Sequence, residues 1–345
     1  MIVKTHTDDG RRESLQNWEL INMALTPEQR DTIAKLDPIF FPYLTYARAR
    51  MIRDNGRFVH YTSAENALKI ITTKCIWMRN TTCMADYREV QHGFTALQRY
   101  FNLHRPVFST ALNDCSPRLA EDAFNLFDQW WQNIQLQTYI TSISEHDNRE
   151  DLHGRLSMWR AFGRATARVA LVIKVPLEVG ANAELGAVLS PVAYFTDDDL
   201  KREIDSITEN VHTNRDFLSG LERGYLLNNV FTMLVNAVIS LKHEGFHEEK
   251  EWRVIYSPRR IPSPHIESSI EVVGGIPQVI YKIPFKNNPG ARITGLEPNE
   301  ILDRVIIGPT QFPWAMYEAF VAALEGAGIA DARNRVFVSQ IPVRT

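Results

Sequence analysis

The segment HEGFHEEKEWRVIY, residues 243–256, holds the densest group of side chains that can do chemistry. Its first five residues match the H-E-x-x-H spacing, in which two histidines bind zinc and the glutamate activates a metal-bound water. The next acids, Glu249 and Glu251, stand at the start of a predicted strand beside Arg253. A carboxylate there suits N-glycosidic chemistry, because it holds a ribose hydroxyl and stabilises a developing positive sugar. The segment therefore predicts two different active sites.

The zinc interpretation needs a rigid helix that presents His243 and His247 on one face. The apolar run 225–242 predicts a helix that leads into the motif. However, Gly245 lies inside the turn, where glycine costs about 1 kcal/mol relative to alanine, and the strand expected at Trp252 ends the helix at its second ligand. The best third ligands lie in a region flanked by Pro and Ser: Glu267 or Glu271. Zinc hydrolysis is therefore a further alternative, and no metal is expected.

The glutamate interpretation has its own structural alternative. On a strand, Glu249, Glu251 and Arg253 point to one face, because side chains alternate. Such a set also suits a cross-strand Glu–Arg ladder on a solvated face, which has no catalytic role. This segment alone leaves both possibilities open.

Composition indicates a soluble globular protein, with 345 residues, 44% hydrophobic and 23% charged. A net charge of −3 provides no overall basic field for broad nucleic-acid affinity. The three cysteines form no C-x-x-C pair, the N-terminus lacks the apolar core of a signal peptide, and no apolar stretch is long enough to span a bilayer. We therefore expect a cytoplasmic protein with no membrane partner.

The elements that must position these residues follow an α+β pattern, with helices in the first two-thirds and strands toward the end. A helical pattern from Leu15 to Ile52 predicts an N-terminal helical extension over residues 1–55. Residues 56–345 are expected to form one α+β domain with a helical insertion around 115–137. Strands are predicted at 58–61, 75–78, 139–144, 169–175, 252–257, 279–284, 304–308 and 336–341. Thr62-Ser63-Ala64-Glu65 predicts a capping box that starts a helix through about Thr73.

Several segments resemble the bacterial family known as domain of unknown function 2971, in the order expected for it. They are FVHYTSAENALKIITTKCIWM, MADYREV, YITSIS, LSMWRAFG, KHEGFHEEKEWRV and VFVSQIPVR. The resemblance covers roughly residues 56 to 345. Ala85 and Phe162 depart from the family pattern, which has Asn and Tyr there.

That family is in turn similar, at its first strand and helix, to ADP-ribosyltransferases of the His-Tyr-Glu type, which include toxins that modify DNA. Here the sequence His60-Tyr61-Thr62, with Asn66 and Ile70 on the following helix, occupies the matching places. This resemblance implies a split antiparallel sheet, surrounded by helices, with NAD in the cleft between its halves. His60 and Glu251 must then lie close enough for one NAD to touch both.

The same resemblance implies roles for individual side chains. Glu251 would hold the nicotinamide-ribose 2′-hydroxyl, Glu249 would orient the acceptor, and His60 with Thr62 would bind a ribose or the nicotinamide amide. Further candidates are Tyr61 and Asn66 beside the cofactor, Ser142 or Ser144 as a brace for Glu251, Tyr87 or Trp159 as a stacking group, and Arg79 or Arg253 as a pyrophosphate or acceptor contact.

The sequence therefore predicts an NAD-consuming ADP-ribosyltransferase or NAD glycohydrolase, in a toxin or antiviral role, with NAD as substrate and a protein or nucleic acid as acceptor. The alternative from a different class is a catalytically silent module that binds a nucleotide or a protein.

Overall fold

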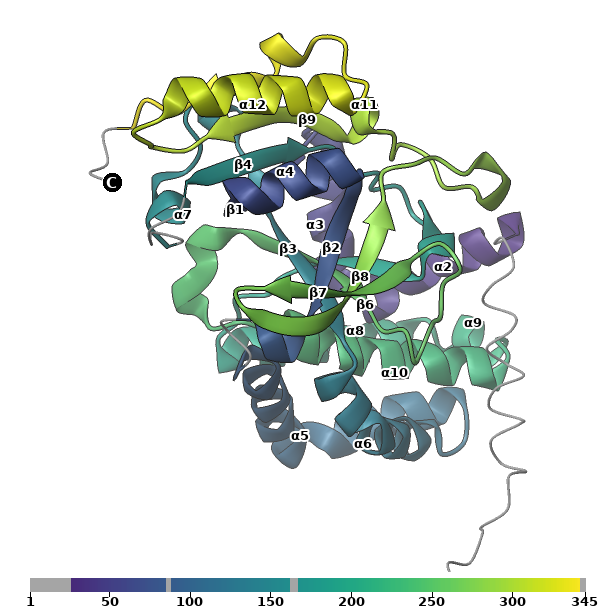
Figure 1. Cartoon of the computed structure of the whole chain (residues 1–345). Coiled ribbons are helices and arrows are strands. Elements are labelled where there is room, and N and C mark those ends of the chain that lie inside the picture. Colours follow the sequence, from purple (N-terminus) through teal and green to yellow (C-terminus); the bar gives the residue numbers. More distant parts are fainter. Residues whose placement is uncertain (1–25, 85–87, 162–166, 342–345) are drawn as a thin grey trace, which may run out of the picture.

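The computed structural model describes residues 26–84, 88–161 and 167–341. Within these ranges the chain is α+β, as predicted, and its ten strands form one open sheet. Helices α4 and α12 pack at one end of the sheet, and α5, α6, α8 and α10 form a layer at the other (Figure 1). No helix of the described ranges combines the length and apolarity that a membrane crossing requires.

The strands are β1 (Arg57–Ser63), β2 (Cys75–Asn80), β3 (Tyr139–His146), β4 (Arg168–Ile173), β5 (Ala187–Pro191), β6 (Glu251–Tyr256), β7 (Glu267–Val273), β8 (Ile276–Pro284), β9 (Leu302–Ile307) and β10 (Val336–Val338). The α-helices are α2 (Pro27–Phe40), α3 (Pro42–Arg53), α4 (Ala64–Thr73), α5 (Arg88–Cys115), α6 (Leu119–Leu136), α7 (Leu156–Ala161), α8 (Asp197–Thr213), α9 (Arg215–Ser219), α10 (Arg223–Ser240), α11 (Pro298–Ile301) and α12 (Pro313–Gly326). A 3₁₀ helix, η5 (Glu244–Glu249), precedes β6.

Strand β3 is the centre of the sheet, and its pairing creates an opening. One edge of β3 pairs with β6 over residues 139–144. The other edge pairs with β2 at 139–140 and with β1 at 144–146, so residues 141–143 have no strand partner there within the described ranges. Strands β1, β4, β9 and β10 therefore diverge from β2, β8 and β7 along this edge, and α4 connects the two groups (Figure 1).

The two largest of the three hydrophobic cores in the described residues lie on either side of the sheet centre. The first joins α2, α5, α6, α8 and α10, and it contains buried Phe124 and Phe127 from α6, the helix that corresponds to the insertion predicted around 115–137. The second joins the sheet to α4 and α12 and centres on fully buried residues such as Phe58, Trp252 and Phe320. Residues 251–256 of β6 contribute to both cores, with Ile255 in the first and Trp252 in the second. Strand β6 is thus held from both sides.

Most predicted elements are present, and the exceptions have physical causes. The single helical pattern from Leu15 to Ile52 is wrong in its described part: it breaks between α2 and α3, because Pro42 keeps Phe41 out of the helical region. Helix α5 and strands β5 and β7 were not predicted. Helix α5 contains Pro106, a residue that normally ends a helix.

The predicted capping box at Thr62 is also wrong. Strand β1 continues through Ser63, whose hydroxyl accepts the Asn66 N–H at 3.2 Å and caps α4. Thr62 therefore has no capping role, and its side chain lines the opening beside β3.

Replacing Ser63 with Ala removes this cap and should lower the free energy of unfolding by about 1 kcal/mol. The matched control is Thr62→Ala, because the Thr62 hydroxyl makes no hydrogen bond within the described residues. Urea denaturation followed by circular dichroism measures both. Equal losses of unfolding free energy in the two variants would contradict the assignment of Ser63 as the cap.

Candidate functional site

A cavity of about 450 Å³ fills the opening between β1, β2 and β3, a volume typical of small-molecule sites. We call it the cleft. The predicted site residues that line it are His60, Tyr61, Thr62, Asn66, Arg79, Ser142, Ser144, Glu249, Glu251 and Arg253. They come from segments as much as 193 positions apart in the sequence, and the folding of β1, β3 and β6 side by side brings them together.

The carboxylate of Glu251 accepts four hydrogen bonds in the cleft. Its Oε1 accepts hydrogen bonds from Ser142 Oγ at 2.5 Å and from Arg253 Nε at 2.9 Å. Its Oε2 accepts from Arg253 at 3.2 Å and from Lys242 Nζ at 3.3 Å. Only 6% of Glu251 and 3% of Arg253 are exposed, so the alternative of a Glu–Arg ladder on a solvated face is wrong.

Lys242 extends this cluster to two further acids. Its ammonium group lies 2.8 Å from Glu249 Oε2 and 2.8 Å from Glu89 Oε1, and Glu89 also pairs with Arg253. The ring of Phe246 covers the ammonium at 4.8 Å. We call these five charged residues the ion network: Glu89, Lys242, Glu249, Glu251 and Arg253. Its three carboxylates outnumber its two cations, so its formal charge is −1.

The two glutamates of the E-x-E pair have different electrostatic states. Burial alone would raise the pKa of Glu251, but Arg253, Lys242 and the Ser142 hydrogen bond outweigh it and lower the pKa to about 2. Burial raises the pKa of Glu249, and its ion pair with Lys242 offsets only part of this effect. Divergent pKa values in a carboxyl pair are typical of sites that divide electrostatic and proton-transfer roles.

The two glutamates also differ in backbone conformation. Glu249 ends η5, Lys250 adopts a left-handed conformation with φ 45°, and β6 begins only at Glu251. The expectation that Glu249 shares the strand with Glu251 is therefore wrong. Arg155 fixes the turn by donating to the carbonyls of Glu248 at 3.0 Å and Glu249 at 3.2 Å.

His60 and Glu251 lie on either side of Ser142. The His60 Nδ1 is 2.8 Å from the Ser142 carbonyl oxygen, which has no strand partner on this edge of β3. Since a carbonyl only accepts, Nδ1 carries the proton. Burial lowers the pKa of His60, so the ring is neutral and its Nε2 has a free lone pair at neutral pH. Both side chains contact one residue, which satisfies the requirement that a single NAD touch both.

The remaining predicted residues differ in their freedom to bind a ligand. Tyr61 is buried, and its hydroxyl accepts the Arg155 N–H at 2.7 Å. Arg79 donates to Gln278 at 3.0 Å and to the Cys83 carbonyl at 2.7 Å, and it pairs with no acid of the described ranges. Arg253 is committed to the ion network and to the Ile239 carbonyl. Of the two arginines, Arg79 is the one with charge available for an anion.

Of the two predicted stacking groups, Trp159 does not line the cleft. Trp159 is 4% exposed, donates from Nε1 to the His153 carbonyl at 2.7 Å, and packs edge-on against Tyr61 with ring centroids 4.9 Å apart. It supports Tyr61 from behind rather than lining the cleft. Tyr87 lies outside the described residues.

The geometry contradicts the zinc alternative. Helix α10 ends at Ser240, and His243 has an extended backbone with φ −60° and ψ 136°. His243 Nδ1 accepts the Gly245 N–H at 3.1 Å, while His247 Nδ1 lies 3.0 Å from the Glu244 carbonyl. The two histidines therefore do not share a face of an α-helix. Among the described residues, no group of His, Cys, Asp and Glu has the arrangement of a metal site.

Two residues of the ion network were not predicted as site residues, although the family resemblance contained the signal. Glu89 is the glutamate of MADYREV, and Lys242 is the first residue of KHEGFHEEKEWRV. Periodicity did not reveal Glu89, because it lies 164 positions from Arg253 in the sequence.

One comparison with known proteins found a match, over the part of the chain that contains the KHEGFHEEKEWRV segment. Residues 158–254 match the family model described as Protein of unknown function (DUF2971). The match begins in α7, ends in β6 and contains both the MWRAFG and KHEGFHEEKEWRV landmarks, so it confirms the predicted family resemblance over residues 158–254. No curated protein and no solved structure matches the chain. The DUF2971 match ends within β6, the strand that holds Glu251.

The lowered pKa of Glu251 predicts a specific dependence of stability on pH. A carboxyl whose pKa falls from 4.5 unfolded to about 2 folded stabilises the fold above its unfolded pKa, and this contribution disappears as pH falls toward the folded value. The free energy of unfolding should therefore fall more steeply between about pH 5 and about pH 2 in the wild type than in Glu251→Gln.

Urea denaturation at a series of pH values measures the two slopes. Glu244→Gln is the control, because Glu244 is exposed in the same segment and should keep the wild-type slope. Parallel curves for wild type and Glu251→Gln would contradict an ionised, network-bound Glu251.

Proposed function

We propose that this protein is an NAD-consuming enzyme that breaks the bond between nicotinamide and ribose and transfers ADP-ribose to an acceptor. The observation that carries the proposal is the placement of His60 and Glu251 on either side of Ser142, at the floor of a cleft between the two halves of the sheet. The resemblance of the His60-Tyr61-Thr62 segment to ADP-ribosyltransferases points to the same site.

The chemistry assigns separate tasks to the two acids. As the C–N glycosidic bond breaks, neutral nicotinamide leaves with the bonding electron pair and the ribose carbon becomes positive. The ionised Glu251 carboxylate stabilises that charge and holds the ribose 2′-hydroxyl. The acceptor's O–H or N–H then attacks this carbon, and its proton passes to Glu249, whose raised pKa suits a general base.

The walls of the cleft supply the binding contacts. Neutral His60 accepts a hydrogen bond at Nε2, Thr62 and Asn66 offer hydroxyl and amide groups, and Arg79 provides a guanidinium for the pyrophosphate. The acceptor is a protein or a nucleic acid, or water in a glycohydrolase. Such an enzyme suits a toxin or an antiviral defence, since it consumes NAD or modifies a macromolecule.

The existing contacts of the Glu251 carboxylate favour a second function. Ser142, Arg253 and Lys242 already occupy both of its oxygens, as expected for a structural brace. In that case the cleft binds a nucleotide without catalysis. NAD then raises the melting temperature of the wild type and releases no nicotinamide.

Incubation with NAD separates the two functions. The wild type should release nicotinamide, measured by chromatography, and Glu251→Gln should lower the rate at least about 100-fold, the usual loss when a group stabilising transition-state charge is removed. Glu244→Gln is the matched control on the exposed side of η5 and should retain the rate. Circular dichroism verifies that each variant is folded.

Nicotinamide release that survives in folded Glu251→Gln would overturn the assigned role of Glu251. No release together with an NAD-dependent rise in melting temperature would favour the binding function instead.

A further inference from the structure

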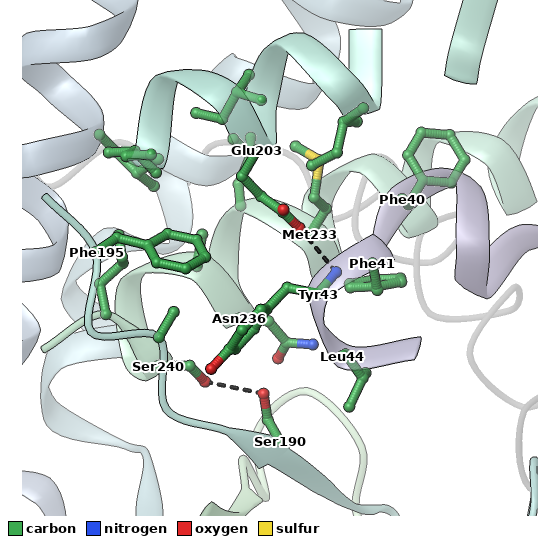
Figure 2. Close-up of a pocket in the computed structure, with 18 of the residues that line it drawn as sticks. Phe40, Phe41, Tyr43, Leu44, Ser190, Phe195, Glu203, Met233, Asn236 and Ser240 are labelled. Carbon is green, nitrogen blue, oxygen red and sulfur yellow. Dashed lines mark hydrogen bonds between the residues drawn. The ribbon is translucent and has the colours of Figure 1, made fainter. Parts of the chain in front are cut away.

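A second cavity, of about 90 Å³, lies between the helical core and the edge strand β5 (Figure 2). Helices α3, α5, α8 and α10 contribute to its wall together with the segment 190–195. Among the described residues, it shares no lining residue with the cleft. We call it the helical-layer cavity.

Most of its wall is apolar and aromatic. Tyr43 and Phe195 pack edge-on with ring centroids 5.1 Å apart, and Phe41 and Phe101 also line the cavity. Phe41, Tyr43 and Phe195 are only partly buried, so the cavity reaches the protein surface. Such a wall suits the faces and edges of a planar ring.

The polar groups of the wall are paired, with one exception. Glu203 Oε1 accepts the Tyr43 N–H at 2.9 Å, and Ser240 Oγ donates to Ser190 Oγ at 3.1 Å (Figure 2). Asn236, on α10, is 8% exposed and lines the same cavity, yet its carboxamide makes no hydrogen bond within the described part of the chain. A buried amide without a partner is costly, and such groups in proteins normally have one.

The unpaired amide defines the chemistry of a partner. A carboxamide presents a C=O acceptor and an N–H donor side by side. The complementary group is a cis-amide edge, in which an N–H donor adjoins a C=O acceptor. A volume of about 90 Å³ is several times that of one water, so the cavity has room for a ligand larger than water.

We propose that the helical-layer cavity is a binding site for a small planar ring with a cis-amide edge, a monocyclic lactam, held by Asn236 between aromatic side chains. This site is separate from the cleft and does not depend on NAD chemistry. It lies directly behind the ion network: Ser190 pairs with Arg253 across β5 and β6, and the Val192 N–H donates to the Glu251 carbonyl at 2.9 Å.

Titration with 2-pyridone, followed by NMR chemical shifts, tests the site. 2-Pyridone has the required edge, and N-methyl-2-pyridone has nearly the same shape without the N–H donor. The wild type should bind 2-pyridone about tenfold more tightly than the methylated ring, because a lost donor also leaves the Asn236 carbonyl unpaired. This comparison needs no variant protein.

A pair of substitutions locates the bound ring. Asn236→Leu should remove the preference between the two rings, whereas Asn229→Leu on the same helix should retain it, because Asn229 bonds the Tyr225 carbonyl and does not line the cavity. Glu251→Gln should also retain the preference, which separates this site from the cleft. Equal affinity of the wild type for the two rings, absence of binding, or a preference that survives in folded Asn236→Leu would each overturn the proposal.

Discussion

The buried pairing of Glu251 with Arg253 is the interaction on which the rest of the structure depends. Arg253 also contacts Glu89 at the start of α5 and the Ile239 carbonyl near the end of α10, while Glu251 binds Ser142 on β3. Charges removed from water must be paired. The helical layer therefore cannot separate from the sheet without leaving a carboxylate or a guanidinium unpaired in the interior.

The ion network also explains the spacing of the KHEGFHEEKEWRV segment. Lys242 follows α10, and the ring of Phe246 covers its ammonium group. The carboxylates of Glu249 and Glu251 pair with the same ammonium group, although the two residues have different backbone conformations. The left-handed Lys250 allows this, because it turns the chain between the two acids. The two histidines of the H-E-x-x-H spacing precede this turn and lie outside any α-helix.

Much of the architecture was predictable because its signals are local. β-branched runs such as 169–175 identified strands, and the Trp252 segment identified β6. The long helix around Pro106 was missed because a local rule predicts a break there, and tertiary packing against α10 and α8 overrides it. Glu251 was predicted through a family resemblance, whereas no local pattern reveals that Glu89 meets Arg253 or that Trp159 packs behind Tyr61.

The length of α4, rather than the identity of the side chains along the strands, sets the size of the opening where β1 and β2 share one edge of β3. Strands β1 and β2 meet β3 at separate places because the ten residues of α4, about 15 Å of helix, hold their ends apart. Substitutions along β1, β3 and β6 can therefore change what the opening recognises without closing it. An insertion or deletion within α4, in contrast, changes the opening itself, so the chain can vary its chemistry far more easily than its dimensions.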